Sequence, residues 1–281
     1  MLLTFTKMHG SGNDFIVLDG YTNVLNLSKQ QIILLANRHI GIGADQILIV
    51  EKSYKKNCDF KYRIFNNDGE EVEHCGNGAR CFMYYIYNKK LTNKRQVNVE
   101  IMKNIISLSL LANSLVEVNM GKPKFNPIDV DFDDTDLNTK MQNDTLLYEI
   151  KSNTWIAIAS LGNPHAVQIV ENLDNYPVDI EGKWLEAHTR FKHKVNAGFM
   201  QIIDKHNIKL RVYERGSGET LACGTGACAA VVCGISMGIL ISPVKVQAKG
   251  GEITIIWHNE NDIIMQGDAN IAFEGKINLN N

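Results

Sequence analysis

The sequence predicts an α+β protein of two similar domains, each a strand-rich, barrel-like sheet around one central helix. A glycine-rich turn, "HCGNGARC" at 74–81, returns as "ACGTGACA" at 222–229, so that Cys75 and Cys223 stand 148 positions apart. Runs with alternating apolar residues, typical of strands, surround each turn. A repeat of this length indicates a duplicated domain and not a solenoid, whose units are shorter. We expect a pseudo-twofold axis to relate the two copies.

The repeat extends upstream of the turns without a gap. The segment "KYRIF" at 61–65 aligns with "KLRVY" at 209–213. We therefore expect one domain over 1–121 and a second over 122–267, with the C-terminal segment 268–281 packing back on the first.

Each copy predicts the same order of elements. The aligned strands lead through a loop to the cysteine, and an apolar helix begins near Asn77 or Thr225. Another helix is expected in each copy: "SKQQIILLANR" opens with a capping-box spacing of Ser28 and Gln31, and "EGKWLEAHTR" follows in the second copy. Later strands are expected at "QVNVEIM", "ISLSLL" and "SLVEVNM", and at "VKVQA", "GEITIIW" and "DIIMQG".

Composition is typical of a soluble globular protein and predicts no nucleic-acid partner, with 21% charged residues, 44% hydrophobic residues and a net charge of −2. The N-terminus lacks an export signal, so we expect the chain in the cytoplasm. The uncharged stretch 221–242 is rich in small residues and predicts a helix buried inside a domain, with no role in a membrane. The acidic segment 129–138 predicts a surface loop.

Six cysteines in a chain without an export signal are expected to remain reduced. The absence of any Cys-x-x-Cys pair disfavours a zinc site or a thioredoxin-like site, so we expect no metal. We interpret four of the cysteines as inert small hydrophobic residues: Cys58, Cys81, Cys228 and Cys233.

The repeated turn itself predicts acid–base chemistry. A cysteine before Gly-x-Gly at a helix N-terminus lies where backbone N–H groups and the helix dipole favour negative charge, so we expect a lowered thiol pKa. The same N–H groups can bind a carboxylate. Two such turns on opposite sides of one carbon could remove a proton from one face and deliver a proton to the other, as in a racemase.

Six segments occur in the order and spacing of one enzyme family, over nearly the whole chain: "MHGSGNDF", "RHIGIGADQ", "FNNDGEEVEHCGNGARC", "GNPHAV", "VNAGFMQ" and "YERGSGETLACGTGACA". The sequence resembles diaminopimelate epimerases, two-thiol enzymes of lysine and peptidoglycan precursor synthesis. The resemblance implies the diaminopimelate epimerase-like fold, no cofactor, and a small-molecule substrate, diaminopimelate. A homodimer is left open.

The resemblance also implies site residues. Cys75 and Cys223 would be the acid and base, with the direction open. The reacting carboxylate would be held by backbone groups of Gly76, Asn77, Gly224 and Thr225. The substrate pocket would be lined by Asn13, Gln46, Asn66, Asn163, Asn196, Glu214 and Arg215, and His165 would lie with Glu214 near the reacting amino group. No proline precedes the Asn196 motif, where many members of the family have one.

The repeat aligns Asn66 and Asn67 with Glu214 and Arg215, which predicts that the two ends of the substrate are treated differently. Arg215 suits a distal carboxylate, and Glu214 suits an ammonium group. Three alternatives remain open at this point. They are a racemase of another amino acid such as proline or hydroxyproline, a thiol redox protein that reversibly joins the two repeated cysteines, and a binding protein without catalysis.

Overall fold

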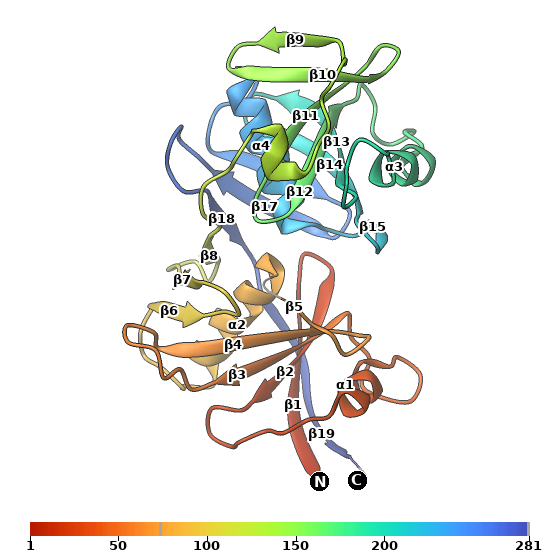
Figure 1. Cartoon of the computed structure of the whole chain (residues 1–281). Helices are drawn as coiled ribbons and strands as arrows, with labels where there is room; N and C mark the ends of the chain where they lie inside the picture. Colours follow the sequence, from red (N-terminus) through yellow and green to blue (C-terminus); the bar gives the residue numbers. More distant parts are fainter. Residues whose placement is uncertain (73–74, 280–281) are drawn as a thin grey trace. The chain divides into compact units, whose positions relative to one another are not determined.

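A computed structural model describes residues 1–72 and 75–279 of the chain. The chain folds as two compact units, one of Met1–Asn119 with Gln266–Asn281 and one of Met120–Met265. Strand β19 (Asn270–Asn278) pairs antiparallel with β1 (Leu2–Gly10), which brings the C-terminal strand beside the N-terminal one (Figure 1). The final two residues of the expected C-terminal segment lie outside the described residues.

The first unit consists of a β-sheet and two helices. Strands β2 and β3 run parallel, as do β4 and β6, and other neighbours are antiparallel. Helix α1 (Lys29–Ala36) joins β2 to β3, and α2 (Gly76–Asn88) joins β5 to β6. The remaining strands are β2 (Asn13–Asp19), β3 (Gln46–Glu51), β4 (Phe60–Asn66), β5 (Glu71–Val72), β6 (Gln96–Glu100), β7 (Ile105–Leu110) and β8 (Val116–Asn119).

The second unit repeats this order. Strands β12 and β13 run parallel, as do β14 and β16. Helix α3 (Val178–Glu186) joins β12 to β13, and α4 (Gly224–Ser236) joins β15 to β16. Its elements also include the 3-10 helix η1 (Pro127–Val130) and β9 (Thr139–Gln142), β10 (Thr145–Lys151), β11 (Thr154–Ser160), β12 (Pro164–Ile169), β13 (Asn196–Asp204), β14 (Asn207–Glu214), β15 (Gly218–Thr220), β16 (Val244–Ala248) and β17 (Gly251–Ile256). Strand β18 (Ile264–Gly267) then spans the return to the first unit.

Strand register repeats along with topology. Ile64 of β4 pairs with Val72 of β5, and 148 positions later Val212 of β14 pairs with Thr220 of β15. Because register is set by which face each side chain must bury, an identical register indicates the same buried face in both units. The expected α+β fold with a duplicated domain is confirmed.

A buried helix lies at the centre of each unit. Helix α2 packs against β1, β2, β3, β7 and β8, and α4 packs against β11, β12, β13, β14 and β17. Both helices bury nearly every residue of their 13-residue length. Gly78 is needed for this packing, because a Cβ there would lie 2.6 Å from the Tyr62 hydroxyl oxygen. In the described part of the chain, no helix is long and apolar enough to cross a membrane.

Three local expectations can be compared with the structure. The capping box at Ser28 and Gln31 is present and opens α1. Helix α3 begins at Val178, earlier than predicted, where acidic residues in the first turn favour a helix N-terminus. The expected surface loop over 129–138 is wrong in part, because Phe132 is buried and stacks on Phe191 with ring centroids 4.7 Å apart.

Candidate active site

In the first unit, Cys75 is the N-cap residue of α2. Its extended backbone lets its carbonyl accept the first helical hydrogen bond, from Ala79 N at 2.8 Å. The thiol Sγ donates toward Asn13 Oδ1 across 3.6 Å, and the Tyr62 hydroxyl donates to the Cys75 carbonyl at 3.4 Å. The turn therefore places the thiol beside the first residue of β2. His74, which precedes Cys75 in the repeated turn, lies outside the described residues.

Neighbouring strand ends bring three predicted pocket residues together. Asn13 begins β2, and Gln46 of β3 pairs with Asn66 of β4. Gln46 Nε2 donates to Asn66 Oδ1 at 2.9 Å, whereas Gln46 Oε1 is buried without a hydrogen-bond partner among the described residues. A buried acceptor of this kind is costly to leave unpaired, so it marks a place where a ligand can donate a hydrogen bond.

Arg80 supports the first turn from inside α2. It is fully buried and donates to Ser11 Oγ at 2.8 Å, to Asn77 Oδ1 at 3.0 Å and to the Asp268 carbonyl at 2.9 Å. These bonds tie the N-terminus of α2 to the loop before Asn13. Arg80 is not among the site residues predicted from the sequence, although a charged residue within an apolar, buried helix is a signal that could have revealed it.

In the second unit, Cys223 is the N-cap residue of α4 and is 6% exposed. Its Sγ donates to Glu214 Oε2 at 3.1 Å and accepts from the backbone N–H of Gly226 at 3.4 Å. Thr220 Oγ1 donates to the other carboxylate oxygen of Glu214 at 2.6 Å. The thiol thus lies between a helix N-terminus and a carboxylate that is itself held in place.

The expected lowering of the thiol pKa is wrong for Cys223. Burial and the adjacent Glu214 carboxylate raise the pKa of Cys223 well above its usual value, although hydrogen bonds from Thr225 and Gly226 act in the opposite direction. Burial removes the water that would otherwise stabilise the thiolate, whereas the helix N-terminus supplies only a few hydrogen-bond donors to it. Cys223 is therefore protonated near neutral pH.

Three further predicted residues form a chain of polar contacts that starts at Cys223 Sγ. Thr225 Oγ1 lies 3.5 Å from Cys223 Sγ and accepts from Asn163 Nδ2 at 3.3 Å. Asn163 Oδ1 lies 3.1 Å from His165 Nε2. Burial and the nearby Arg215 charge lower the pKa of His165 to about 3, so the imidazole is neutral and donates from Nε2 to the Asn163 oxygen. His165 thereby orients the Asn163 amide.

Asn196 and Arg215 link the strand ends of the second unit. Asn196 is buried, and its Nδ2 donates to the Pro164 carbonyl at 2.9 Å while its Oδ1 accepts from Arg215 N at 2.9 Å. The Arg215 guanidinium donates to the His193 carbonyl at 3.3 Å. Both ends of the Asn196 side chain are engaged with backbone, so it fixes the loop that presents Arg215.

The two sets of residues occupy equivalent positions. Phe15 pairs with Gln46 between parallel strands, as His165 pairs with Asn196, and the repeat places Glu214 where the first unit has Asn66. At this aligned position the first unit therefore carries a neutral amide, whereas the second carries a carboxylate.

All six cysteines are present as thiols. Burial raises the pKa of Cys233 to about 12 and raises the pKa of Cys81 as well, which agrees with the expectation that both are inert. Within the described ranges, no cluster of three or more His, Cys, Asp or Glu side chains could hold a metal ion.

The fold has solved relatives. A phenazine biosynthesis protein of the PhzF family from Bacillus anthracis matches with a TM-score of 0.69 and 17% identity, over 99% of this chain and 100% of that one. A hydroxyproline epimerase from Agrobacterium vitis matches with a TM-score of 0.65 and 11% identity, over 98% of this chain and 92% of that one. These likenesses show the fold, and they place the chain in the class of duplicated α+β proteins, here with a cysteine turn in each unit.

Within that class, the chain belongs to the diaminopimelate epimerase family, whose model matches residues 5–126 and 157–272. A diaminopimelate epimerase of Burkholderia ambifaria is 54% identical over 99% of both chains, and that of Burkholderia vietnamiensis is 52% identical over 100% of both. The resemblance stated from the sequence is confirmed.

Proposed function

We propose that the protein interconverts L,L- and meso-2,6-diaminopimelate without a cofactor, with Cys75 and Cys223 as its acid–base pair. The observation that carries the proposal is the thiol at the N-terminus of a buried helix in each of two units with one topology. Inversion at a carbon needs one group for each face, and a duplicated turn supplies two. The reaction would serve lysine and peptidoglycan precursor synthesis in the cytoplasm.

The helix N-termini suit the reacting carboxylate. Backbone N–H groups at Gly76 and Asn77, and at Gly224 and Thr225, belong to the first turns of α2 and α4 and can donate to an anion. When the α-proton leaves, negative charge spreads onto the carboxylate, where these donors stabilise it. The protein therefore needs no electron sink other than the carboxylate and its donors.

The direction of proton transfer can be argued from the state of Cys223. Cys223 is protonated and donates to Glu214, so it suits the acid in the direction in which Cys75 is the base. After turnover Cys75 carries the proton removed from substrate and Cys223, which has given its proton to the other face, is the thiolate. The reverse reaction uses each group in the other role.

The two units carry different polar residues at aligned positions, which suits a substrate whose two ends are bound differently. Arg215 can grip a distal carboxylate with its planar guanidinium, and Glu214 is the candidate partner of an ammonium group. Gln46 Oε1, buried without a partner among the described residues, is a further acceptor for ammonium. Asn13 and Asn66 in the first unit, and Asn163 and Asn196 in the second, are the further proposed substrate-binding residues, with His165 orienting Asn163.

The test is to incubate reduced protein with L,L-diaminopimelate in heavy water and to follow α-carbon deuterium and the meso isomer. Deuterium at one centre with meso product is expected. Folded protein that yields neither would contradict the proposal, and screening of proline and hydroxyproline would then test the alternative racemase activity. An active form that requires a disulfide would instead favour the redox interpretation.

A further inference from the structure

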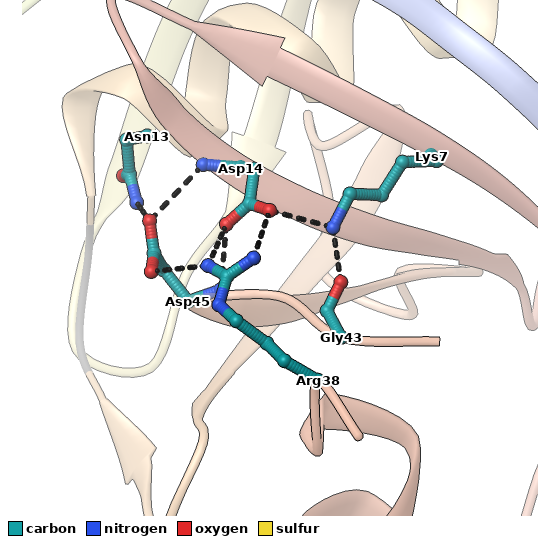
Figure 2. Close-up of polar contacts among 6 residues, drawn as sticks. All are labelled: Lys7, Asn13, Asp14, Arg38, Gly43 and Asp45. Atoms are coloured by element: carbon teal, nitrogen blue, oxygen red, sulfur yellow. Dashed lines mark hydrogen bonds and ion pairs between the residues drawn. The ribbon is translucent and has the colours of Figure 1, made fainter. Parts of the chain in front are cut away.

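A network of four charged side chains lies behind Asn13 and consists of Lys7, Asp14, Arg38 and Asp45 (Figure 2). Asn13 Nδ2 donates to Asp45 Oδ2 at 2.9 Å, and Asp45 Oδ1 accepts from Arg38 Nη2 at 2.8 Å. Asp45 therefore connects the amide beside the Cys75 thiol to an arginine. The mechanism proposed above gives neither Arg38 nor Asp45 a role, although both belong to the segment "RHIGIGADQ".

The network holds Asp45 from several directions. Arg38 grips Asp14 with two bonds, of 2.8 and 2.7 Å, and Lys7 Nζ donates to Asp14 at 2.6 Å and to the Gly43 carbonyl. Asp45 N donates to Asp14 Oδ1 at 2.8 Å, and Asp14 N donates to Asp45 Oδ2 at 3.2 Å. Burial alone would raise the pKa of Asp14, but the bonds from Arg38 and Lys7 outweigh it and hold that pKa well below its usual range.

The chemistry of Asp45 dictates which way the Asn13 amide points. An ionised carboxylate only accepts hydrogen bonds, so the Asn13 atom that faces it must be the NH₂ nitrogen. The carbonyl oxygen Oδ1 must then point the other way, toward Cys75 Sγ at 3.6 Å. A flipped amide would set two acceptors against each other at Asp45 and lose a charge-assisted hydrogen bond.

We propose that Asp45, held by Arg38, is a positioning residue that keeps the carbonyl oxygen of Asn13 directed at the Cys75 thiol. An oxygen in this place accepts from S–H and stabilises the protonated thiol, whereas an NH₂ group there would stabilise the thiolate. The network thus biases the protonation equilibrium of Cys75. The catalytic meaning of this bias rests on the proposed function, in which Cys75 carries a proton to or from substrate.

The second unit orients its equivalent amide by other means. Asn163 donates to Thr225 and directs its oxygen at His165, while Cys223 finds its acceptor in Glu214. The Asn13 side chain that accepts from Cys75 is thus a neutral amide, whereas the Glu214 side chain that accepts from Cys223 is a carboxylate. Rotation of an amide by half a turn replaces its oxygen with its NH₂ group, whereas a carboxylate presents an oxygen either way. This difference explains why the first unit needs Asp45.

Other groups near Cys75 remain constant when Asp45 is changed. Tyr62 donates to the Cys75 carbonyl from β4, Arg80 binds the first turn of α2, and the Cys81 thiol follows in the same helix. The charges of Asp14 and Arg38 also remain. Among these described groups, a change at position 45 therefore alters the charge of Asp45 and the orientation of Asn13, and two variants separate these effects.

The experiment measures the rate at which iodoacetamide alkylates Cys75, resolved by peptide mass spectrometry from pH 6 to 10. In Asp45→Ala the Asn13 amide is released, and the midpoint of the rate profile should fall by about one pH unit, the effect of one hydrogen bond. Asp45→Asn should stay close to wild type. The backbone N–H of Asp14 donates to the same position and keeps the oxygen of an asparagine facing Asn13.

Equal shifts of the Cys75 midpoint in Asp45→Ala and Asp45→Asn would show a charge effect and overturn the proposal. An unchanged midpoint in Asp45→Ala would also overturn it.

Asp59→Ala, which removes the exposed ion pair with Lys94 in the same unit, is the matched control and should not move the midpoint. Asp45→Ser, too short to reach Asn13, replaces the alanine variant if that protein does not fold. Because the readout is alkylation, a wild type without epimerase activity would overturn the proposed function and leave this test intact.

Discussion

The Cys223 thiol donates to Glu214 Oε2 across 3.1 Å, at a position where the other half of the duplication carries Asn66. One duplicated turn has therefore acquired two electrostatic settings. The carboxylate beside Cys223 favours the protonated thiol, whereas the amide beside Cys75 brings no charge.

Glu214→Gln should lower the pKa of Cys223, because Glu214 is one of the two causes that raise it and glutamine carries no charge. We expect the midpoint of Cys223 alkylation to move to lower pH and kcat/KM to fall about 10- to 100-fold. Peptide-resolved alkylation and steady-state kinetics measure the two effects. Glu252→Gln, from an exposed ion pair with Lys245 in the same unit, is the control. An unchanged Cys223 profile would refute the electrostatic role of Glu214.

Cys75→Ala and Cys223→Ala should each abolish epimerisation, because either change removes the proton carrier of one face. Cys228→Ala should keep kcat and lose about 1 kcal/mol of unfolding free energy, since its buried side chain serves packing. Kinetics and urea unfolding of all three variants check this. Full activity in Cys75→Ala would end the two-thiol proposal.

Arg80→Ala should lower the free energy of unfolding by about 3 kcal/mol, because it removes the hydrogen bonds that Arg80 donates to the buried side chains of Ser11 and Asn77 and to the Asp268 carbonyl. Urea unfolding measures the loss. Arg95→Ala, which removes long bonds to the backbone carbonyls of Leu110 and Leu111 in the same unit, should change stability by less than about 1 kcal/mol. A loss for Arg80→Ala no larger than that of the control would contradict the anchoring role.

His165 should make the fold sensitive to mild acid. Its pKa is lowered to about 3 in the folded state from 6.5, so as pH falls below 6.5 the unfolded chain binds a proton that the folded chain does not. Stability should therefore drop by about 2 to 3 kcal/mol between roughly pH 6.5 and 4.5. In His165→Gln, which can still donate to Asn163, this part of the pH dependence should vanish. His258→Gln, at an exposed position, should retain it.

Local signals explain what could be read from the residue order. The capping box at Ser28, the alternating strands and the glycines after each cysteine act over a few residues, so they predicted the helices and strands that the structure contains. The repeated turn and the segments aligned with it predicted that the domain is duplicated. Most of the candidate site residues were then predicted from the motifs of the family.

Long-range packing decided the rest. Arg80 became an anchor only because folding brings Ser11 and Asp268 to it, and Asn13 is oriented by Asp45 and Arg38, which lie more than twenty residues away in the chain.

The sequence by itself determined the duplicated α+β fold, the placement of each cysteine at a helix N-terminus and the membership of the family. Tertiary structure alone decided that Cys223 is held protonated and not as the thiolate expected from its turn. The physical reason is that burial and a carboxylate from a neighbouring strand act on a charge more strongly than the local donors of a helix end, and both depend on which residues the fold brings together.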